Sequence, residues 1–230
     1  MNISGFQKMT LLDFPGRVAC TLFTSGCNFR CPFCHNASLV THIDNNNHYS
    51  EEEILSYLKK REGLLDGVCI TGGEPLLQKD IAEFLGKIKE LGYAVKLDTN
   101  GSNPEKLKEL FSKGLVDYVA MDIKNCKEKY PLTTGVCDLD IAAIEKSAEF
   151  LMNSGIDYEF RTTVVREFHT EKDIEEIGKW LKGAKRYFLQ NFVDSGDLIS
   201  EGLSAVSPTV LCNMQQKVCQ FIVNTEIRGV

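Results

Sequence analysis

The chain has 230 residues, of which 43% are hydrophobic and 25% are charged, and its net charge is −6. This length suits one substantial hydrophobic core, and the composition is that of an ordinary globular protein. The absence of a lysine or arginine block disfavours a nucleic-acid surface, and no apolar run is long enough to cross a bilayer. Since the N-terminus also lacks the pattern of a secretory signal, we expect a cytoplasmic protein.

Six strand-then-helix units follow one another along the chain, after a turn at residues 13–16. A polar surface loop is expected at residues 41–48 and an irregular loop at 125–138. The predicted strands are residues 18–23, 68–71, 94–97, 118–121, 158–165 and 187–190. The first predicted helix begins at a capping box of Ser50 and Glu53. Four more span about 80–91, 104–113, 138–151 and 173–181, and the last begins at Ser207.

This alternation predicts an α/β fold with parallel strands and right-handed crossovers, either an open doubly wound sheet or an incomplete barrel. We expect a single domain over residues 1–230. It comprises an N-terminal extension (1–17), six βα units (18–192), and a linker with a C-terminal helix (193–230). In both architectures ligands bind at the C-terminal ends of the strands.

Three cysteines lie within residues 27–34, CNFRCPFC, directly after the first predicted strand. Three thiolates in one tight loop suit a [4Fe–4S] cluster that keeps one iron open for a ligand. A zinc site formed with His35 is the alternative, although structural zinc needs four protein ligands. In a reducing compartment, thiols at this density indicate metal binding rather than disulfides.

Polar residues also follow the other predicted strands. The open iron could take the amino and carboxylate groups of a small ligand, with Glu74 accepting from the ammonium and Lys124 pairing with the carboxylate. Gly72 and Gly73 would let the backbone approach that ligand. These strand-end residues are Gly72, Gly73, Glu74, Asp98, Thr99, Asn100, Asp122, Lys124, Gln190 and Asn191.

Each of these residues also has a plain structural interpretation. The two glycines and residues 98–101 are typical of ordinary turns. Lys124 could simply be a solvated lysine, and Asp122 could simply be its partner. Arg161, in the middle of an apolar strand, needs a partner if it faces the core.

The other cysteines, and the histidines other than His35, receive no functional role. Cys20 and Cys69 are expected to be buried in strands, and core packing is favoured for Cys212 and Cys219. Cys126 and Cys137 bracket the irregular loop, and their roles stay open. His42, His48 and His169 lie in polar segments and are assigned no role.

Residues 27–34 resemble the CxxxCxxC motif of the radical S-adenosylmethionine (SAM) enzymes, and GGEP at 72–75 resembles that superfamily's motif for the methionine amino group. This resemblance implies a partial (β/α)6, TIM-like barrel. Further motifs resemble glycyl-radical-enzyme activases, and residues 5–36 are most similar to anaerobic ribonucleoside-triphosphate reductase activating proteins. These motifs are DFPG at 13–16, CHN at 34–36, DTNG at 98–101 and MDIK at 121–124.

The resemblance assigns roles to individual residues. Cys27, Cys31 and Cys34 would ligate the cluster. Phe33 and His35 would lie beside the adenine of SAM. Gly73 and Glu74 would contact its methionine ammonium, and Lys124 would approach its carboxylate. Gly72 and Asn100 are placed with the cofactor-binding residues. Asp98, Thr99 and Asp122, with the Met121 carbonyl, match a monovalent-cation site, and Arg161 matches a basic residue near the substrate glycine.

The implied activity is reductive cleavage of SAM followed by removal of a hydrogen atom from a glycine of a glycyl-radical enzyme, with flavodoxin or ferredoxin as electron donor. Residues 190–192 are Gln-Asn-Phe, where pyruvate formate-lyase activases place a histidine, which argues against that lyase as the target. Two alternatives remain. One is a radical SAM enzyme acting on a small molecule, like 7-carboxy-7-deazaguanine synthase, and the other is a non-catalytic iron–sulfur or zinc module.

Overall fold

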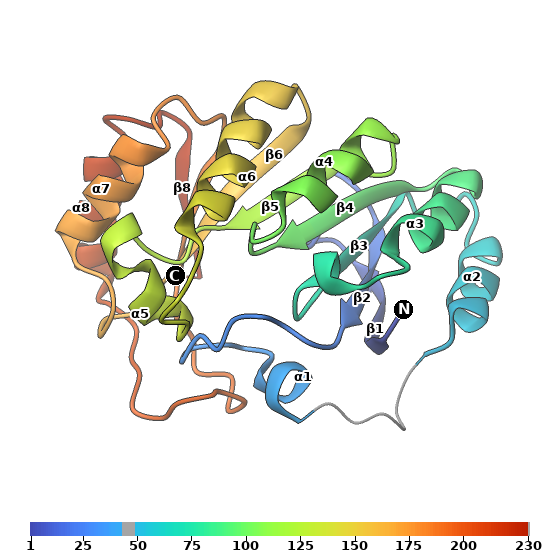
Figure 1. Ribbon diagram of the computed structural model, residues 1–230, viewed down its shortest axis with the longest axis horizontal. Coiled ribbons are helices and arrows are strands. Elements are labelled where there is room, and N and C mark those ends of the chain that lie inside the picture. The colour runs from blue at the N-terminus through green and yellow to red at the C-terminus, as the bar shows by residue number, and fades with distance from the viewer. Residues whose placement is uncertain (43–48, 230) are drawn as a thin grey trace. The chain divides into compact units, whose positions relative to one another are not determined.

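The computed structural model describes residues 1–42 and 49–229 (Figure 1). Most of the predicted loop at 41–48, including His48, lies outside the described residues. The chain divides into two compact units. The first comprises residues 1–28, 38–99 and 103–119, and the second comprises residues 29–37, 100–102 and 120–230. The single domain over 1–230 stays a prediction.

The first unit holds strands β1 (Ile3–Thr10), β2 (Ala19–Thr24), β3 (Gly67–Gly72), β4 (Ala94–Thr99) and the start of β5 (Tyr118–Asp122), which are neighbours in chain order. β2, β3 and β4 are parallel, as predicted. β1 pairs antiparallel with β2, although the sequence indicated only an extension there. Its pairing is interrupted by register shifts, so its sequence lacks the strict alternation of a regular strand.

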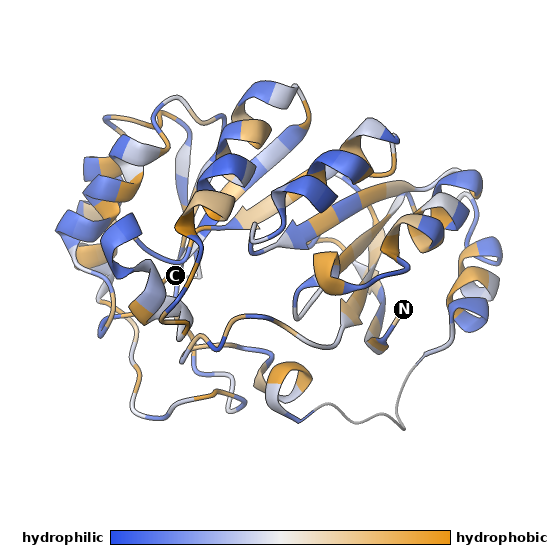
Figure 2. Ribbon diagram, in the orientation of Figure 1, coloured by the Kyte–Doolittle hydropathy of each residue, from blue (hydrophilic) through white to orange (hydrophobic). Residues whose placement is uncertain are grey.

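The three predicted helices of the first unit begin where the sequence places them. Ser50 and Glu53 form the expected capping box at α2, and Asn103 caps α4 directly before Pro104. α3 and α4 contain both hydrophobic and hydrophilic residues along their length, as expected of helices with one buried face (Figure 2). The helices of this unit are α1 (Ala37–Thr41), α2 (Glu51–Lys59), η1 (Pro75–Leu77), α3 (Ile81–Glu90) and α4 (Pro104–Ser112). α1 and η1 are too short for the sequence to have indicated them.

The second unit holds the end of β5, then β6 (Asp157–Val164), β7 (Tyr187–Asn191) and β8 (Thr225–Arg228), again neighbours in chain order. β6, β7 and β8 are parallel. β8 lies in the segment predicted to hold only a linker and a helix, and its length of four residues explains why no pattern revealed it.

Helices α6 (Ile141–Ser154), α7 (Glu171–Trp180) and α8 (Pro208–Val218) also belong to the second unit, and α7 packs against α8 (Figure 1). Gly178 permits this packing, because a Cβ atom there would come within 2.8 Å of the Val218 side chain. Cys20 and Cys69 are buried, as expected. The core position expected for Cys212 is wrong, since this residue of α8 is exposed next to the inward-facing Leu211.

The predicted irregular loop at 125–138 contains two short helices, η2 (Lys127–Lys129) and α5 (Tyr130–Thr134). Pro131 and two threonines make this segment a poor helix by propensity. The burial of Tyr130 and hydrogen bonds from the Thr133 and Thr134 hydroxyls to carbonyls of the preceding turn hold α5 in place. Gly135 ends it with a φ of +67°.

The α/β class with parallel strands is confirmed. Within the described ranges 1–42 and 49–229, no helix has the length and apolar character needed to span a membrane.

Candidate functional site

The cysteine loop follows β2. Cys27 belongs to the first unit, and Cys31 and Cys34 belong to the second. Cys31 is buried, whereas Cys27 and Cys34 are partly exposed. The Cys34 N–H donates to the Cys31 carbonyl at 3.0 Å, so these two cysteines lie on one tight turn.

Two segments of the second unit form hydrogen bonds with this loop. The Arg30 N–H donates to the Thr134 carbonyl of α5 at 2.8 Å, and a Cβ atom at Gly135 would lie only 2.6 Å from the Arg30 oxygen. The Ser200 N–H donates to the Pro32 carbonyl at 2.9 Å. The predicted irregular loop and the linker therefore both support the loop that carries Cys31 and Cys34.

The two residues expected beside the adenine have defined neighbours in the second unit. Phe33 is buried against Phe168 and His169, with ring centroids 5.8 and 6.3 Å apart. His35 stacks on Phe192, with centroids 5.7 Å apart and ring planes inclined by 25°. Phe192 belongs to the segment 190–192 in which the resemblance would place a histidine. The aromatic ring thus fixes the orientation of the His35 ring.

The glycine pair lies at the end of β3 in the first unit. The Gly73 N–H donates to the Thr24 carbonyl and the Glu74 N–H to the Gly26 carbonyl, both at 2.8 Å. A Cβ atom at Gly73 would lie 2.0 Å from the Gly26 oxygen, and Gly72 has a φ of +113°. Gly72 and Gly73 are therefore required because of the backbone conformation and the close approach of another backbone segment. The sequence alone did not reveal this reason.

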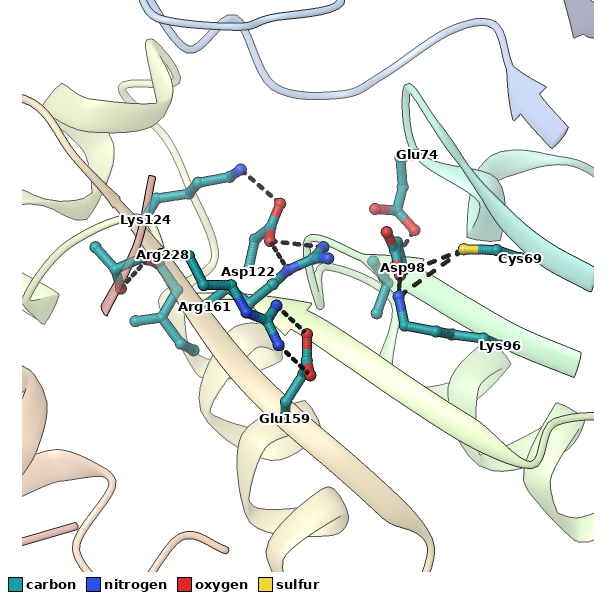
Figure 3. A network of polar contacts seen from close by, with 12 residues as sticks. Cys69, Glu74, Lys96, Asp98, Asp122, Lys124, Glu159, Arg161 and Arg228 are labelled. Atoms are coloured by element: carbon teal, nitrogen blue, oxygen red, sulfur yellow. Dashed lines mark hydrogen bonds and ion pairs between the residues drawn. The ribbon is translucent and has the colours of Figure 1, made fainter. Parts of the chain in front are cut away.

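Glu74 is fully buried, and its Oε1 accepts hydrogen bonds from the Leu76 N–H at 3.0 Å and the Thr99 hydroxyl at 2.8 Å. On the same strand as Thr99, Asp98 forms an ion pair with Lys96 (Figure 3). In the second unit, the Asn100 side chain accepts from the Ser102 N–H at 2.9 Å, which is a turn contact. The turn interpretation therefore describes Asn100, whereas Thr99 takes part in a buried polar contact and Asp98 in a partly buried one.

Asp122 in the second unit lies between two cations (Figure 3). Lys124 Nζ is 2.9 Å from Oδ2, and Arg161 Nε donates to Oδ1 at 3.0 Å. Although burial raises the pKa of Asp122, the charges of Lys124 and Arg161 bring it well below its usual range. Burial lowers the pKa of Lys124, but Asp122 and then the Cys31 and Cys34 thiols raise it above its ordinary value. The partner expected for a core-facing Arg161 is thus confirmed.

Three polar features escaped the sequence analysis. His169 is buried; the Val165 N–H donates to its Nδ1 at 3.1 Å, and its Nε2 lies 2.8 Å from the Lys124 carbonyl oxygen. Arg228 of β8 makes a two-point contact with the buried Glu159 at 3.1 and 3.3 Å. Lys96 is buried in the middle of β4. Only Lys96 carried a signal, namely a charge inside an apolar strand, which is the signal that singled out Arg161.

The donor chemistry of the cysteine loop fits a cluster better than a zinc ion. The loop offers three thiolates, whereas a structural zinc ion takes four protein ligands. Three cysteines suit a [4Fe–4S] cluster that keeps one iron open for a ligand. Two residues before Cys27, the buried Ser25 hydroxyl has no hydrogen-bond partner within the part of the chain that the structure describes. A cluster sulfur beside it would supply an acceptor.

Comparison with known proteins decides the family. The family model for the radical SAM superfamily matches residues 21–181, which is more than half of the chain. The chain belongs to this superfamily. Radical SAM membership implies a [4Fe–4S] cluster and SAM as cofactors.

Two curated relatives and one solved structure illustrate the likeness. A putative glycyl-radical enzyme activating enzyme of Methanocaldococcus jannaschii is 35% identical over 195 residues, 83% of this chain and 79% of the relative. The pyruvate formate-lyase-activating enzyme of Clostridium pasteurianum is 31% identical over 140 residues, 58% of this chain and 57% of the relative. SuiB of Streptococcus suis bound to S-adenosylmethionine has a TM-score of 0.70 at 18% identity, covering 89% of this chain but 48% of SuiB.

The chain thus spans about half the length of SuiB. At this identity the likeness concerns the fold alone, and it confirms the expected fold class, the partial (β/α)6 barrel of radical SAM enzymes.

Proposed function

We propose that this radical SAM protein is an activase, which removes a hydrogen atom from a glycine of a glycyl-radical enzyme. The observation that carries the proposal is the 35% identity, over 79% of its length, to a relative named as a putative glycyl-radical enzyme activating enzyme. The reduced [4Fe–4S] cluster, when bound, supplies the electron that cleaves SAM to methionine and a 5′-deoxyadenosyl radical.

The residues of the chain have distinct roles in this proposal. Cys27, Cys31 and Cys34 hold the cluster. Glu74 accepts hydrogen bonds from the SAM ammonium, and its complete burial strengthens them because little water competes. Lys124 pairs with the SAM carboxylate.

The remaining site residues shape the space around SAM. Phe33 and His35 flank the adenine, each fixed by an aromatic neighbour. Gly72 and Gly73 bring the backbone beside the methionine end. Arg161 lies beside the substrate glycine, and its ion pair with Asp122 fixes where its guanidinium points.

The target in this proposal is anaerobic ribonucleoside-triphosphate reductase. Besides the motifs at 5–36, the support is the sequence Gln-Asn-Phe at 190–192, where pyruvate formate-lyase activases place a histidine, and Phe192 of this segment stacks with His35. Flavodoxin or ferredoxin is the proposed electron donor. A reducing cytoplasm is the proposed location, since it suits an oxygen-sensitive cluster in a chain with nine cysteines.

The deciding experiment combines the anaerobically reconstituted protein with SAM, a reductant and the reductase, and records the electron paramagnetic resonance spectrum. We expect a glycyl radical signal with the reductase and none with a reductase variant that lacks the radical glycine. Pyruvate formate-lyase serves as the second partner, and a signal with it alone would reject the proposed target.

A small-molecule radical SAM enzyme, like 7-carboxy-7-deazaguanine synthase, is the second candidate. It predicts 5′-deoxyadenosine formation that depends on the small substrate and no protein radical. A non-catalytic iron–sulfur or zinc module predicts no 5′-deoxyadenosine under any of these conditions.

A further inference from the structure

Lys96 is a buried cation in the first unit. It lies in the middle of β4, its side chain is 2% exposed, and it forms an ion pair with Asp98. The two residues are two positions apart and therefore share one face of the strand. On the neighbouring strand Cys69 is the register partner of Lys96, and its Sγ lies 3.8 Å from Lys96 Nζ and 3.8 Å from Asp98 Oδ1 (Figure 3).

Packing alone does not explain a lysine at this position. Its neighbours Val95 and Leu97 are apolar and fully buried, and a methionine would fill a similar volume. A buried ammonium is unfavourable unless a counter-charge compensates its lost hydration. The pairing with Asp98, whose side chain is 15% exposed, supplies that counter-charge and fixes the carboxylate.

The resemblance assigns the Asp98 carboxylate, together with Thr99 and Asp122, to a monovalent-cation site. The structure gives each of these groups another partner. Asp98 pairs with Lys96, the Thr99 hydroxyl donates to Glu74, and Asp122 lies between Lys124 and Arg161. A cation at Asp98 would be repelled by the Lys96 ammonium, so these residues do not fit the implied ion.

We propose that Lys96 is a positioning residue that supplies, from within the chain, the positive charge at Asp98. The protein then needs no monovalent cation to neutralise this carboxylate. Glu74 is left as the carboxylate that binds the SAM ammonium, a consequence that rests on the function proposed above. The ion pair itself does not depend on that function.

The first test measures thermal unfolding of the cluster-free protein in potassium, sodium and choline chloride at equal concentrations. We expect the same Tm for the wild type in all three salts. A saturable rise of the wild-type Tm in potassium or sodium chloride, absent in choline chloride and abolished by Asp98→Asn, would overturn the proposal.

The second test uses Lys96→Met, which leaves Asp98 without its cation. We expect its Tm in choline chloride to lie roughly 10 °C below that of the wild type, as for a broken buried ion pair in a chain of this size. Potassium or sodium should restore part of this loss. The double variant Lys96→Met/Asp98→Asn should regain stability and lose the response to cations. Lys87→Met, at a lysine that is 38% exposed and also ion-paired, is the matched control without a cation response.

A folded Lys96→Met variant that no cation stabilises would contradict the proposal, since a purely structural lysine predicts this result. If Lys96→Met does not fold, the comparison of salts for the wild type and the double variant still test whether Lys96 supplies the charge at Asp98. A third measurement is the SAM affinity of the reconstituted wild type. We expect it to be equal in potassium chloride and choline chloride. The unfolding measurements use neither cluster nor partner, so their outcome is independent of whether the protein activates a glycyl-radical enzyme.

Discussion

Thr99 donates its hydroxyl hydrogen to the carboxylate of Glu74, with 2.8 Å between Oγ1 and Oε1. The contact joins the ends of β3 and β4, and both side chains are buried. Thr99, which belongs to a turn motif in the sequence, therefore orients the carboxylate proposed to bind the SAM ammonium.

Replacement of Thr99 by valine tests this contact, because valine keeps the shape and removes the hydroxyl. A hydrogen bond to a charged group contributes about 1.5–3 kcal/mol, so we expect SAM affinity to fall roughly 10- to 100-fold. Equilibrium binding of SAM to the reconstituted protein measures it. The exposed Thr209→Val variant is the control, and equal affinities of the two variants would contradict the assignment.

Lys124→Met should weaken SAM binding by removing the proposed partner of the SAM carboxylate. A charge-assisted contact of this kind contributes about 2 kcal/mol, so we expect the Kd to rise roughly 30-fold. The variant also removes one of the two cations beside Asp122, and Arg161 remains to hold that carboxylate. Lys146→Met, at an exposed position on α6, serves as the matched control. An unchanged Kd in Lys124→Met would reject this role.

The cysteines divide into two sets that iron analysis can separate. Single alanine variants of Cys27, Cys31 and Cys34 should lose most of the iron and sulfide incorporated on reconstitution, and they should form no 5′-deoxyadenosine. Cys137→Ala and Cys212→Ala, at exposed cysteines elsewhere in the second unit, should retain both. Iron retention in Cys31→Ala would show that the cluster ligands are assigned wrongly.

The sequence predicted the regular elements well because each carries a local signal. Ser50 and Glu53 are three residues apart and form the capping box at α2, and Pro104 follows its cap Asn103 directly. β1, β8 and α5 were missed because tertiary contacts, rather than local pattern, stabilise them. α5 combines a proline with two threonines, and it forms because Tyr130 is buried.

The candidate site was predictable where motifs are contiguous, as in residues 27–34 and 72–75. The supporting contacts are not contiguous. His169 is 45 residues from the Lys124 carbonyl that it contacts, and nothing in its polar surroundings indicates burial. Residues 190–192 were noted because pyruvate formate-lyase activases have a histidine in this segment, but the stack of Phe192 with His35 depends on the fold.

Asp173 gives a prediction of pH dependence outside the proposed site. It caps α7 with Thr170 and lies 2.6 Å from Lys129 Nζ. Burial raises the pKa of Asp173, but Lys129 and Thr170 together bring it below its ordinary value. A lowered folded-state pKa means that this stabilisation is present above the unfolded-state pKa of about 3.9 and is lost as the pH falls through the folded-state value.

Asp173→Asn should therefore lower the free energy of unfolding by about 2 kcal/mol at neutral pH, through loss of the cap and the ion pair. The difference from the wild type should stay constant down to about pH 5 and shrink below about pH 4. Urea unfolding of the cluster-free protein along this pH range measures it. A difference that grew toward acid would mean that the carboxylate is protonated in the native state.

Gly73 and Gly86 form a matched pair for the last prediction. A Cβ atom at Gly73 would lie 2.0 Å from the Gly26 oxygen, whereas one at Gly86, inside α3, would meet no atom within 4 Å. Gly86→Ala should raise the Tm by about 2 °C, because alanine favours a helix by 0.5–1 kcal/mol over glycine. Gly73→Ala should cost about 3 kcal/mol or more, because backbone must move to admit the methyl group. It should also abolish SAM binding, since the displaced segment carries Glu74. Thermal unfolding and SAM titration check both variants, and a stable Gly73→Ala protein that still binds SAM would show that this backbone approach is not required.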